Sequence, residues 1–193
     1  MTWLVAGLGN PGERYAKTRH NLGAMVADEL ARSAGGRFRK VRFLPLELAE
    51  LHEGGERLLV ARSHRFMNEA GPSYASLAAK QHVGSAHVIA VHDELDLPAG
   101  ALRVKSGGST AGHNGLRSLQ QALGTPEFLR VRVGIGRPPG RQDPADFVLS
   151  PFPSREREEV AVLVGEAADA VRSLIGEGLE RTQDRFNRAG PRA

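Results

Sequence analysis

The loop at residues 7–12, which reads GLGNPG, follows a short apolar strand from Trp3 to Ala6, and its glycines and proline restrict it to a tight turn. Its three glycines fit the dinucleotide-binding pattern GxGxxG. In the nucleotide fold that loop opens directly into a helix, and an acidic residue about 20 positions later ends the next strand. Neither condition holds here, because no apolar helical period begins before Leu22, and Asp28 and Glu29 lie inside that later helix. The chain is therefore not expected to bind a nicotinamide cofactor.

The remaining chain alternates strand-like and helix-like segments separated by Gly or Pro, which is the pattern of an α/β domain. Strands are expected over 3–7, 38–51, 57–61, 88–91, 102–105 and 128–135. Helices are expected over 22–34, over 69–83 with Asn68 as its cap, over 116–123 with Gly124 closing it, and from Ser154 onward. The run 88–91 is apolar throughout and suits a strand with parallel neighbours, whereas 38–61, with glycines at 54 and 55, is typical of an antiparallel hairpin.

Composition narrows the class of protein. The 193 residues are 40% hydrophobic, enough for one sizeable core, so a single domain over 1–193 is expected. There is no run of about 18 apolar residues and no charged start followed by a long apolar centre, so we expect a cytoplasmic protein without membrane attachment. The absence of cysteine excludes disulfides, thiolate metal ligands and a thiol nucleophile. A formal charge of +4 favours encounter with a polyanion without establishing it.

Polar side chains follow several of the expected strands. Asn10 and His20 come after the first strand, Asn68 after the hairpin and Asp93 after 88–91, and a glycine-rich loop covers 107–115. In open α/β sheets ligands bind beyond the carboxyl ends of the strands, so we place the candidate site there. A histidine can take a proton from water when a carboxylate fixes its other ring nitrogen, and His20 with Asp93 fits that division of labour.

Three carboxamides, from Asn10, Asn68 and Asn114, accompany this pair. Carboxamides are neutral groups that both donate and accept, so they can hold a peptide backbone or donate to a developing oxyanion. Each asparagine also has a plain structural explanation, since an asparagine after a strand often caps a helix or makes a turn. Asp93 has the equally plain explanation of a solvated loop residue.

Two other chemistries have weaker support. Ser106 and Ser109 lie near His113 and make a serine nucleophile the better rival, but the elbow pattern Gly-x-Ser-x-Gly is absent. The seven histidines are scattered with no spacing such as His-Glu-x-x-His, so a metal site would have to be assembled by folding. We therefore prefer water as the nucleophile and expect neither a metal nor a cofactor.

Several motifs, in their order and spacing, resemble bacterial peptidyl-tRNA hydrolases over essentially the whole chain. They are GLGNPG at 7–12 with Tyr15, TRHN at 18–21, FMN at 66–68 with Gly71, HDELDLPAG at 92–100, GHNG at 112–115 and RVGIGRP at 132–138. Agreement among several separate motifs is far more specific than a glycine pattern alone. The resemblance implies a single α/β domain with a twisted mixed β-sheet flanked by helices.

The resemblance also implies hydrolysis of the ester that joins a peptide to the terminal ribose of tRNA, which recycles tRNA from abortive translation. By that likeness His20 is the general base, Asp93 orients it, and Asn10 helps to distinguish a blocked aminoacyl group from a free one. The implied pocket for the peptide and the 3′ CCA end is lined by Tyr15, Phe66, Met67, Asn68, His113 and Asn114. Lys105 and Arg132 match positions that contact tRNA phosphates, including those of the acceptor stem. The Pro-rich stretch around 137–150 matches a mobile lid, and we expect a monomer whose partner is peptidyl-tRNA.

The chain departs from the family pattern at two places. Phe66 stands where many relatives have tyrosine, which removes a hydroxyl but keeps a ring that can stack on adenine. The loop at 109–111 reads STA where relatives are often richer in glycine, which we expect to stiffen the lip of the pocket.

An alternative function is that of a non-catalytic RNA-binding or splicing partner on the same scaffold, as in some plant organelle relatives. The basic residues Arg181, Arg185, Arg188 and Arg192 suit it, although they equally suit a solvated helix face. The complete set of pocket residues and the lack of a segment rich in Ser and Arg, typical of organelle transit, argue against it.

Overall fold

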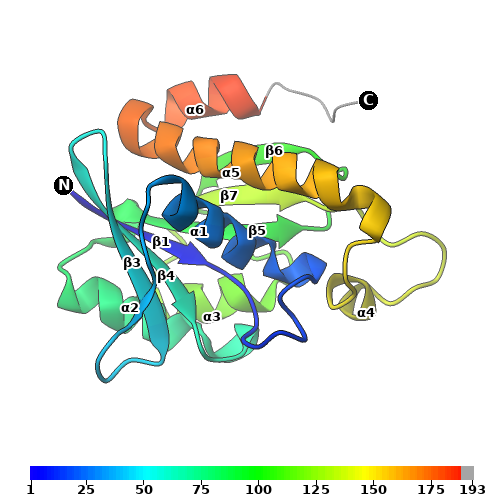
Figure 1. Ribbon diagram of the computed structural model, residues 1–193, viewed down its shortest axis with the longest axis horizontal. Helices are drawn as coiled ribbons and strands as arrows, with labels where there is room; N and C mark the ends of the chain where they lie inside the picture. Colours follow the sequence, from blue (N-terminus) through cyan, green and yellow to red (C-terminus); the bar gives the residue numbers. More distant parts are fainter. Residues whose placement is uncertain (188–193) are drawn as a thin grey trace.

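The computed structural model describes residues 1–187 and contains one seven-stranded mixed sheet of order β2-β3-β4-β1-β5-β7-β6 (Figure 1). The strands are β1 (Thr2–Gly7), β2 (Arg39–Lys40), β3 (Leu46–Glu53), β4 (Glu56–Ser63), β5 (Val88–Glu94), β6 (Leu102–Ser106) and β7 (Leu129–Gly134). The α-helices are α1 (Leu22–Ser33), α2 (Gly71–Lys80), α3 (Asn114–Leu123), α4 (Pro144–Val148), α5 (Arg157–Glu177) and α6 (Leu179–Phe186). Short 3-10 helices are η1 (Arg19–Asn21), η2 (Met67–Glu69), η3 (Ser85–His87) and η4 (Ser154–Glu156).

The centre of the sheet is parallel and its edges are antiparallel. Strands β4, β1, β5 and β7 run in the same direction, while β2 and β3 at one edge and β6 at the other run against their neighbours. The β3–β4 pairing ends with Glu53 opposite Glu56, so the glycines at 54 and 55 make the turn. The predicted mixed sheet, the antiparallel hairpin and the parallel neighbours of β5 are confirmed.

Helices cover both faces of the sheet (Figure 1). On one face, Val5 and Val91 pack with α1 and α5 in one apolar cluster. On the other, Leu4 and Ala90 pack with α2 and α3 in a second cluster. Strand β5 is buried along its whole length, which explains its continuous apolar run. Among the described helices, none combines the length and the apolar character needed to span a bilayer.

The prediction of one strand over 38–51 is wrong. The chain forms β2, turns at 41–45 and returns as β3, with Arg39 opposite Leu48. Phe43 has φ 64°, in the left-handed region, and Pro45 has no N–H to donate to a sheet ladder. Both residues interrupt an extended strand at this point.

The prediction of a helix over 69–83 capped by Asn68 is also wrong in its start. Helix α2 begins at Gly71, and Asn68 lies inside the preceding η2, where its side chain caps no helix. Pro72 sits in the first turn of α2, where its missing N–H costs nothing. The N–H of Gly71 donates instead to Oγ of Ser118 over 2.8 Å.

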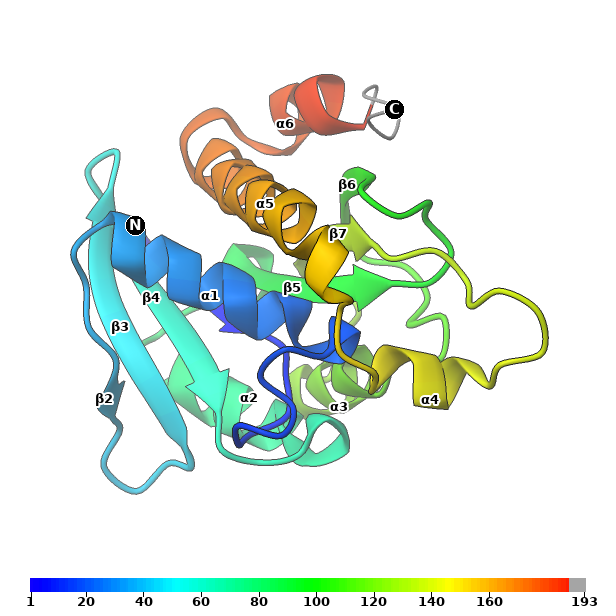
Figure 2. The same ribbon diagram turned by 45° about the vertical axis from the view of Figure 1, so that its right-hand side comes forward.

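Parallel strands bring their carboxyl ends to one edge of the sheet, and β5 and β7 point toward the side on which α4 lies (Figure 2). One expectation is revised there. Strand β5 continues to Glu94, so Asp93 lies within a strand and is 3% exposed, which excludes a solvated loop residue. The stretch 137–150 contains the five-residue helix α4, and the N–H of Ala145 in its first turn donates to the side chain of Asp143.

Candidate active site

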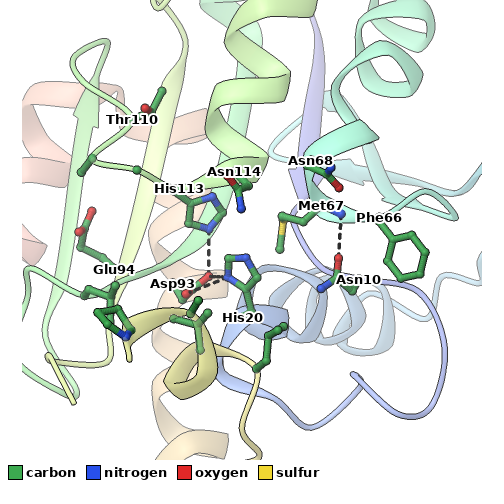
Figure 3. Close-up of a pocket in the computed structure, with 17 residues that line it drawn as sticks. Asn10, His20, Phe66, Met67, Asn68, Asp93, Glu94, Thr110, His113 and Asn114 are labelled. Carbon is green, nitrogen blue, oxygen red and sulfur yellow. Dashed lines mark hydrogen bonds and ion pairs between the residues drawn. The ribbon is translucent and has the colours of Figure 1, made fainter. Parts of the chain in front are cut away.

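A cavity of about 340 Å³ opens at the carboxyl ends of β1 and β5 (Figure 3). It brings together eight of the residues that the sequence singled out, since its walls include Asn10, His20, Phe66, Met67, Asn68, Asp93, His113 and Asn114. The remaining lining residues come from the end of β5, from the loop before α3 and from α4 with the residue after it; they are Glu94, Leu95, Thr110, Ala111, Gly112, Pro144, Ala145, Val148 and Leu149.

Asp93 lies between two histidines. Its carboxylate oxygens are 3.0 and 3.1 Å from Nδ1 of His20, and Oδ1 is also 3.0 Å from Nε2 of His113 (Figure 3). An ionised carboxylate only accepts hydrogen bonds, so both ring nitrogens carry their proton toward Asp93. His20 therefore keeps Nε2 as its unprotonated nitrogen when the ring is neutral.

His113 is held in one tautomer by its second contact. Its Nδ1 atom accepts the N–H groups of Gly115 and Leu116 at 3.1 and 3.2 Å, so the side chain is the N-cap of α3. A nitrogen that accepts from two N–H groups carries no proton, so His113 is neutral with its hydrogen on Nε2. The helix cap thus orients the donor that His113 presents to Asp93.

The electrostatics of the group favour an ionised carboxylate. Burial alone raises the pKa of Asp93, but the interactions with His113 and His20 outweigh it and hold that pKa well below its ordinary value. A charged Asp93 fixes the His20 ring and stabilises the imidazolium that forms when Nε2 takes up a proton.

The donor atoms of His20, Asp93 and His113 lie within 4.8 Å of one another, the size of a metal site. The residues do not fit one. A neutral histidine that binds a metal through Nε2 carries its proton on Nδ1, yet Nδ1 of His113 faces two backbone N–H donors. Hydrogen bonds to Asp93 account for the cluster as it stands.

Tight packing between α1 and the sheet positions His20. A Cβ atom on Gly23 would lie 2.0 Å from the carbonyl oxygen of Val91, so the helix approaches β5 at a distance that only glycine permits. His20 precedes α1 in η1 and is buried, and Asp93 stands two residues beyond Val91. The close contact therefore brings the imidazole and the carboxylate together.

Asn10 faces the cavity from the GLGNPG loop. Its Oδ1 atom accepts the N–H of Met67 over 2.7 Å, which joins this loop to η2 (Figure 3). Asn68 and Asn114 line the same cavity from η2 and from the first residue of α3. The three carboxamides thus surround the space beside His20.

The aromatic and basic candidates lie at or beyond the rim. Phe66 lines the cavity and is 52% exposed, while Tyr15 is placed outside the lining and meets Phe66 edge-on with ring centroids 6.1 Å apart. Lys105 on β6 and Arg132 on β7 also lie outside the lining, and Nε of Arg132 donates to Glu94 at 3.1 Å. Burial lowers the pKa of Lys105, and the positive charges of Arg132 and Arg130 lower it further.

Sequence reasoning missed four residues of this region. Asn21 and His92 stood in the quoted motifs without a role, although both are buried and polar. Glu94 lines the cavity and pairs with Arg132.

Arg130 is completely buried. It donates to the carbonyls of Gly108 and Ser109 at 2.8 and 2.6 Å and so anchors the loop before α3. A buried charge in a β-branched strand was the available signal for Arg130.

A mixed sheet of this topology with a carboxylate-bound histidine in a cavity at its carboxyl edge places the chain among α/β proteins with an acid–base site. The peptidyl-tRNA hydrolase family model matches residues 4–192, and the chain belongs to that family. It is 52% identical over 184 residues to a peptidyl-tRNA hydrolase of Nocardia farcinica, covering 95% of each chain. It is 53% identical over 185 residues to that of Frankia casuarinae, covering 96% of this chain and 93% of the relative.

Solved structures agree with these sequence matches. The crystal structure of peptidyl-tRNA hydrolase from Acinetobacter baumannii superimposes with a TM-score of 0.89 at 30% identity, covering 99% of this chain and 97% of the other. The recognition from motifs and the predicted fold class are therefore confirmed. Neither these relatives nor this solved structure supports the alternative of a non-catalytic splicing partner. Two of the arginines that suited that alternative, Arg188 and Arg192, lie outside the described residues.

Proposed function

We propose that this chain hydrolyses the ester between a peptide, or an N-blocked aminoacyl group, and the 3′ ribose of tRNA, with His20 as the general base. The observation that carries the proposal is the contact between Nδ1 of His20 and Asp93 at 3.0 Å, inside the cavity of a chain that belongs to this family. The activity recycles tRNA from abortive translation, and water is the nucleophile.

The chemical step follows from the protonation states at His20. Its Nε2 atom takes a proton from water as the water oxygen bonds to the ester carbonyl carbon. The tetrahedral intermediate then breaks its bond to the ribose oxygen, and the proton on Nε2 passes to that leaving oxygen. Asp93 stabilises the imidazolium between these two transfers. A positioned base of this kind contributes about 10²- to 10⁴-fold in rate.

Binding of the acyl group is assigned to the carboxamides. Since Oδ1 of Asn10 is occupied by Met67, its Nδ2 atom is the group available to donate to a peptide carbonyl. Asn68 and Asn114 add donors and acceptors around the scissile ester. Phe66 and Met67 supply apolar surface, and the exposed ring of Phe66 suits stacking on the terminal adenine, with Tyr15 behind it.

Binding of the tRNA backbone is assigned to Lys105 and Arg132, on the adjacent antiparallel strands β6 and β7. Cations that contact phosphates fix register and orientation rather than sequence. In this proposal the two cations hold the acceptor stem while the 3′ CCA end enters the cavity. We expect the chain to act as a monomer in the cytoplasm.

The segment 137–150 is proposed as a lid within a single domain covering 1–193. Its residues Pro144, Val148 and Leu149 form one wall of the cavity. Its end is fastened beside the catalytic pair, because the guanidinium of Arg19 donates to Oγ of Ser150 over 2.6 Å. Displacement of α4 would open the cavity to a peptide without moving the sheet.

The test is release of tRNA from N-acetyl-aminoacyl-tRNA by the purified full chain in the presence of a chelator. Wild type is expected to turn over, and His20→Ala is expected to bind the substrate without releasing tRNA. Equal turnover by both proteins would overturn the assignment of His20, and binding without release by wild type would overturn the proposed function itself.

A further inference from the structure

Asn21 is a buried asparagine that the catalytic step leaves without a role. It follows His20 directly in η1 and is 4% exposed. Its Oδ1 atom accepts the backbone N–H of Asn10 over 2.9 Å, and its Nδ2 atom donates to the backbone carbonyl of Asn10, also over 2.9 Å. One carboxamide therefore satisfies both main-chain groups of a single loop residue, as a neighbouring strand would.

The Asn21 carboxamide has little room to move. A Cβ atom on Gly9 would lie 3.1 Å from both Cγ and Nδ2 of Asn21, so the loop backbone packs directly against the amide plane. Swinging the side chain away would also leave two half-buried main-chain groups without these partners, which is unfavourable. The backbone of Asn10 is thus fixed relative to η1, the element that carries His20.

The side chain of Asn10 is fixed by a separate contact. Because the N–H of Met67 can only donate, the Asn10 atom that meets it at 2.7 Å is the oxygen, and Nδ2 is left as a donor. Figure 3 shows that nitrogen on the side of Asn10 that faces His20. The cavity therefore presents an N–H group to whatever lies beside the catalytic imidazole.

We propose that Asn21 is a positioning residue that sets, through Asn10, the preference for substrates whose α-amino group is acylated; this rests on the proposed function. An acylated amino group offers a carbonyl oxygen that accepts from Nδ2 of Asn10. A free α-ammonium offers only donors and meets Nδ2 unfavourably. Discrimination of this kind depends on the donor being held in place, because a hydrogen bond weakens steeply as its geometry departs from linear.

The experiment compares wild type with Asn21→Leu, which is close to isosteric and removes both contacts, and Asn21→Ala, whose smaller side chain admits water to the freed main-chain groups. The matched control is Ser118→Ala, which removes another buried side-chain acceptor of a backbone N–H, at Gly71 outside the cavity. For each protein, kcat/KM is measured on N-acetyl-aminoacyl-tRNA and on the same aminoacyl-tRNA with a free amino group.

The Asn21 variants are expected to lose about tenfold in the ratio of the two kcat/KM values, the effect of one misplaced hydrogen bond. The loss should lie mainly in KM for the acetylated substrate, and the pH profile of kcat should match wild type, because His20 and Asp93 are untouched. Ser118→Ala should keep the wild-type ratio. These results would support the positioning role.

A variant that loses activity equally on both substrates, with the ratio unchanged, would overturn the inference and leave Asn21 as a structural residue. Alanine and leucine differ in size, so one of the two substitutions can fold where the other does not. Circular dichroism identifies the variant that folds, and the ratio of its two kcat/KM values decides the question. Failure of the proposed function is distinguishable, since wild type itself would then release no tRNA from the acetylated substrate.

Discussion

The Nε2 atom of His113 lies 3.0 Å from Oδ1 of Asp93, on the carboxylate that also holds His20. One acid thus serves two imidazoles with different tasks. His20 presents its free nitrogen to the cavity, while His113 uses both nitrogens within the protein, one on Asp93 and one on the start of α3. The helix, the acid and the base form a continuous series of hydrogen bonds that orients the reacting nitrogen.

Removing the base or reversing its orientation should abolish most of the turnover. His20→Ala is expected to lower kcat by about 10²- to 10⁴-fold, the usual contribution of a general base. Asp93→Asn should cost a comparable factor, because an amide nitrogen facing Nδ1 favours the wrong tautomer of His20. Single-turnover release of tRNA measures both, with thermal unfolding as the control for structure. Wild-type turnover in Asp93→Asn would show that the acid does not orient the base.

The two roles of His113 can be separated by substitution. Serine is a good N-cap but too short to reach Asp93, so His113→Ser should retain α3 and lower kcat by about tenfold through the lost hydrogen bond. His113→Ala should show the same kcat as His113→Ser. It should also lower the free energy of unfolding by about 1 kcal/mol, because alanine removes the cap of α3. Urea unfolding and initial rates of the two variants provide the comparison. Identical stability of the Ser and Ala variants would contradict the capping role.

Lys105 should contribute to binding rather than to chemistry. Lys105→Ala is expected to raise KM for a tRNA substrate, leave kcat close to wild type, and reduce the slope of log KM against log salt by about 1, as one lost phosphate contact does. Kinetics at several salt concentrations measure the slope. A minimal substrate that carries only the terminal adenosine is the control, because it offers no acceptor-stem phosphate. An equal loss on that substrate would count against the assignment.

Local pattern was sufficient for much of the fold. The apolar run at 88–91 and the glycine that closes α3, with φ 72° at Gly124, are encoded within a few residues, and both predictions hold. The start of α2 was missed because it depends on Pro72 and on the contact of Gly71 with Ser118, 47 residues away. A helix start that relies on a distant acceptor leaves a weak local signal.

In the candidate site, too, some features could be predicted from local pattern and others depend on contacts between distant segments. His20 comes after β1 and Asp93 lies near the carboxyl end of β5, so their proximity followed from the rule that parallel strands end at one edge. The contacts of Asp93 with His113 and of Asn21 with Asn10 depend on the side toward which each side chain points and on how loops pack. Periodicity in the sequence does not specify those directions in irregular segments.

The glycine that lets α1 approach β5 should be irreplaceable. In Gly23→Ala the new methyl would lie 2.0 Å from the carbonyl oxygen of Val91, so the helix must shift, at a cost of about 3 kcal/mol in the free energy of unfolding. Gly165→Ala is the matched control, since that helical glycine has open space around its Cβ position and alanine should add about 1 kcal/mol. Urea unfolding measures both. Equal stability of the two variants would refute the close approach.

His92 should make the folded state sensitive to mild acid. Burial, followed by the electrostatic interaction with His113, lowers the pKa of His92 to about 3 from the ordinary 6.5. Its Nδ1–H donates to the carbonyl of Asp93 over 2.7 Å, and its Nε2 atom is buried without a partner among the described residues. The unfolded chain therefore binds one more proton than the folded chain between pH 6.5 and about 3.

Stability must then fall as the pH decreases through that window, because protons favour the state that binds more of them. From pH 6 to pH 5 the contribution of His92 is a loss of about 1 kcal/mol. His92→Asn keeps an amide donor for the Asp93 carbonyl but does not titrate, so its free energy of unfolding should decrease by about 1 kcal/mol less than that of wild type over the same interval. Urea unfolding at both pH values measures the difference, and the other histidines cancel because both proteins contain them. Parallel decreases in the two proteins would show that His92 is protonated in the folded state as readily as in the unfolded chain.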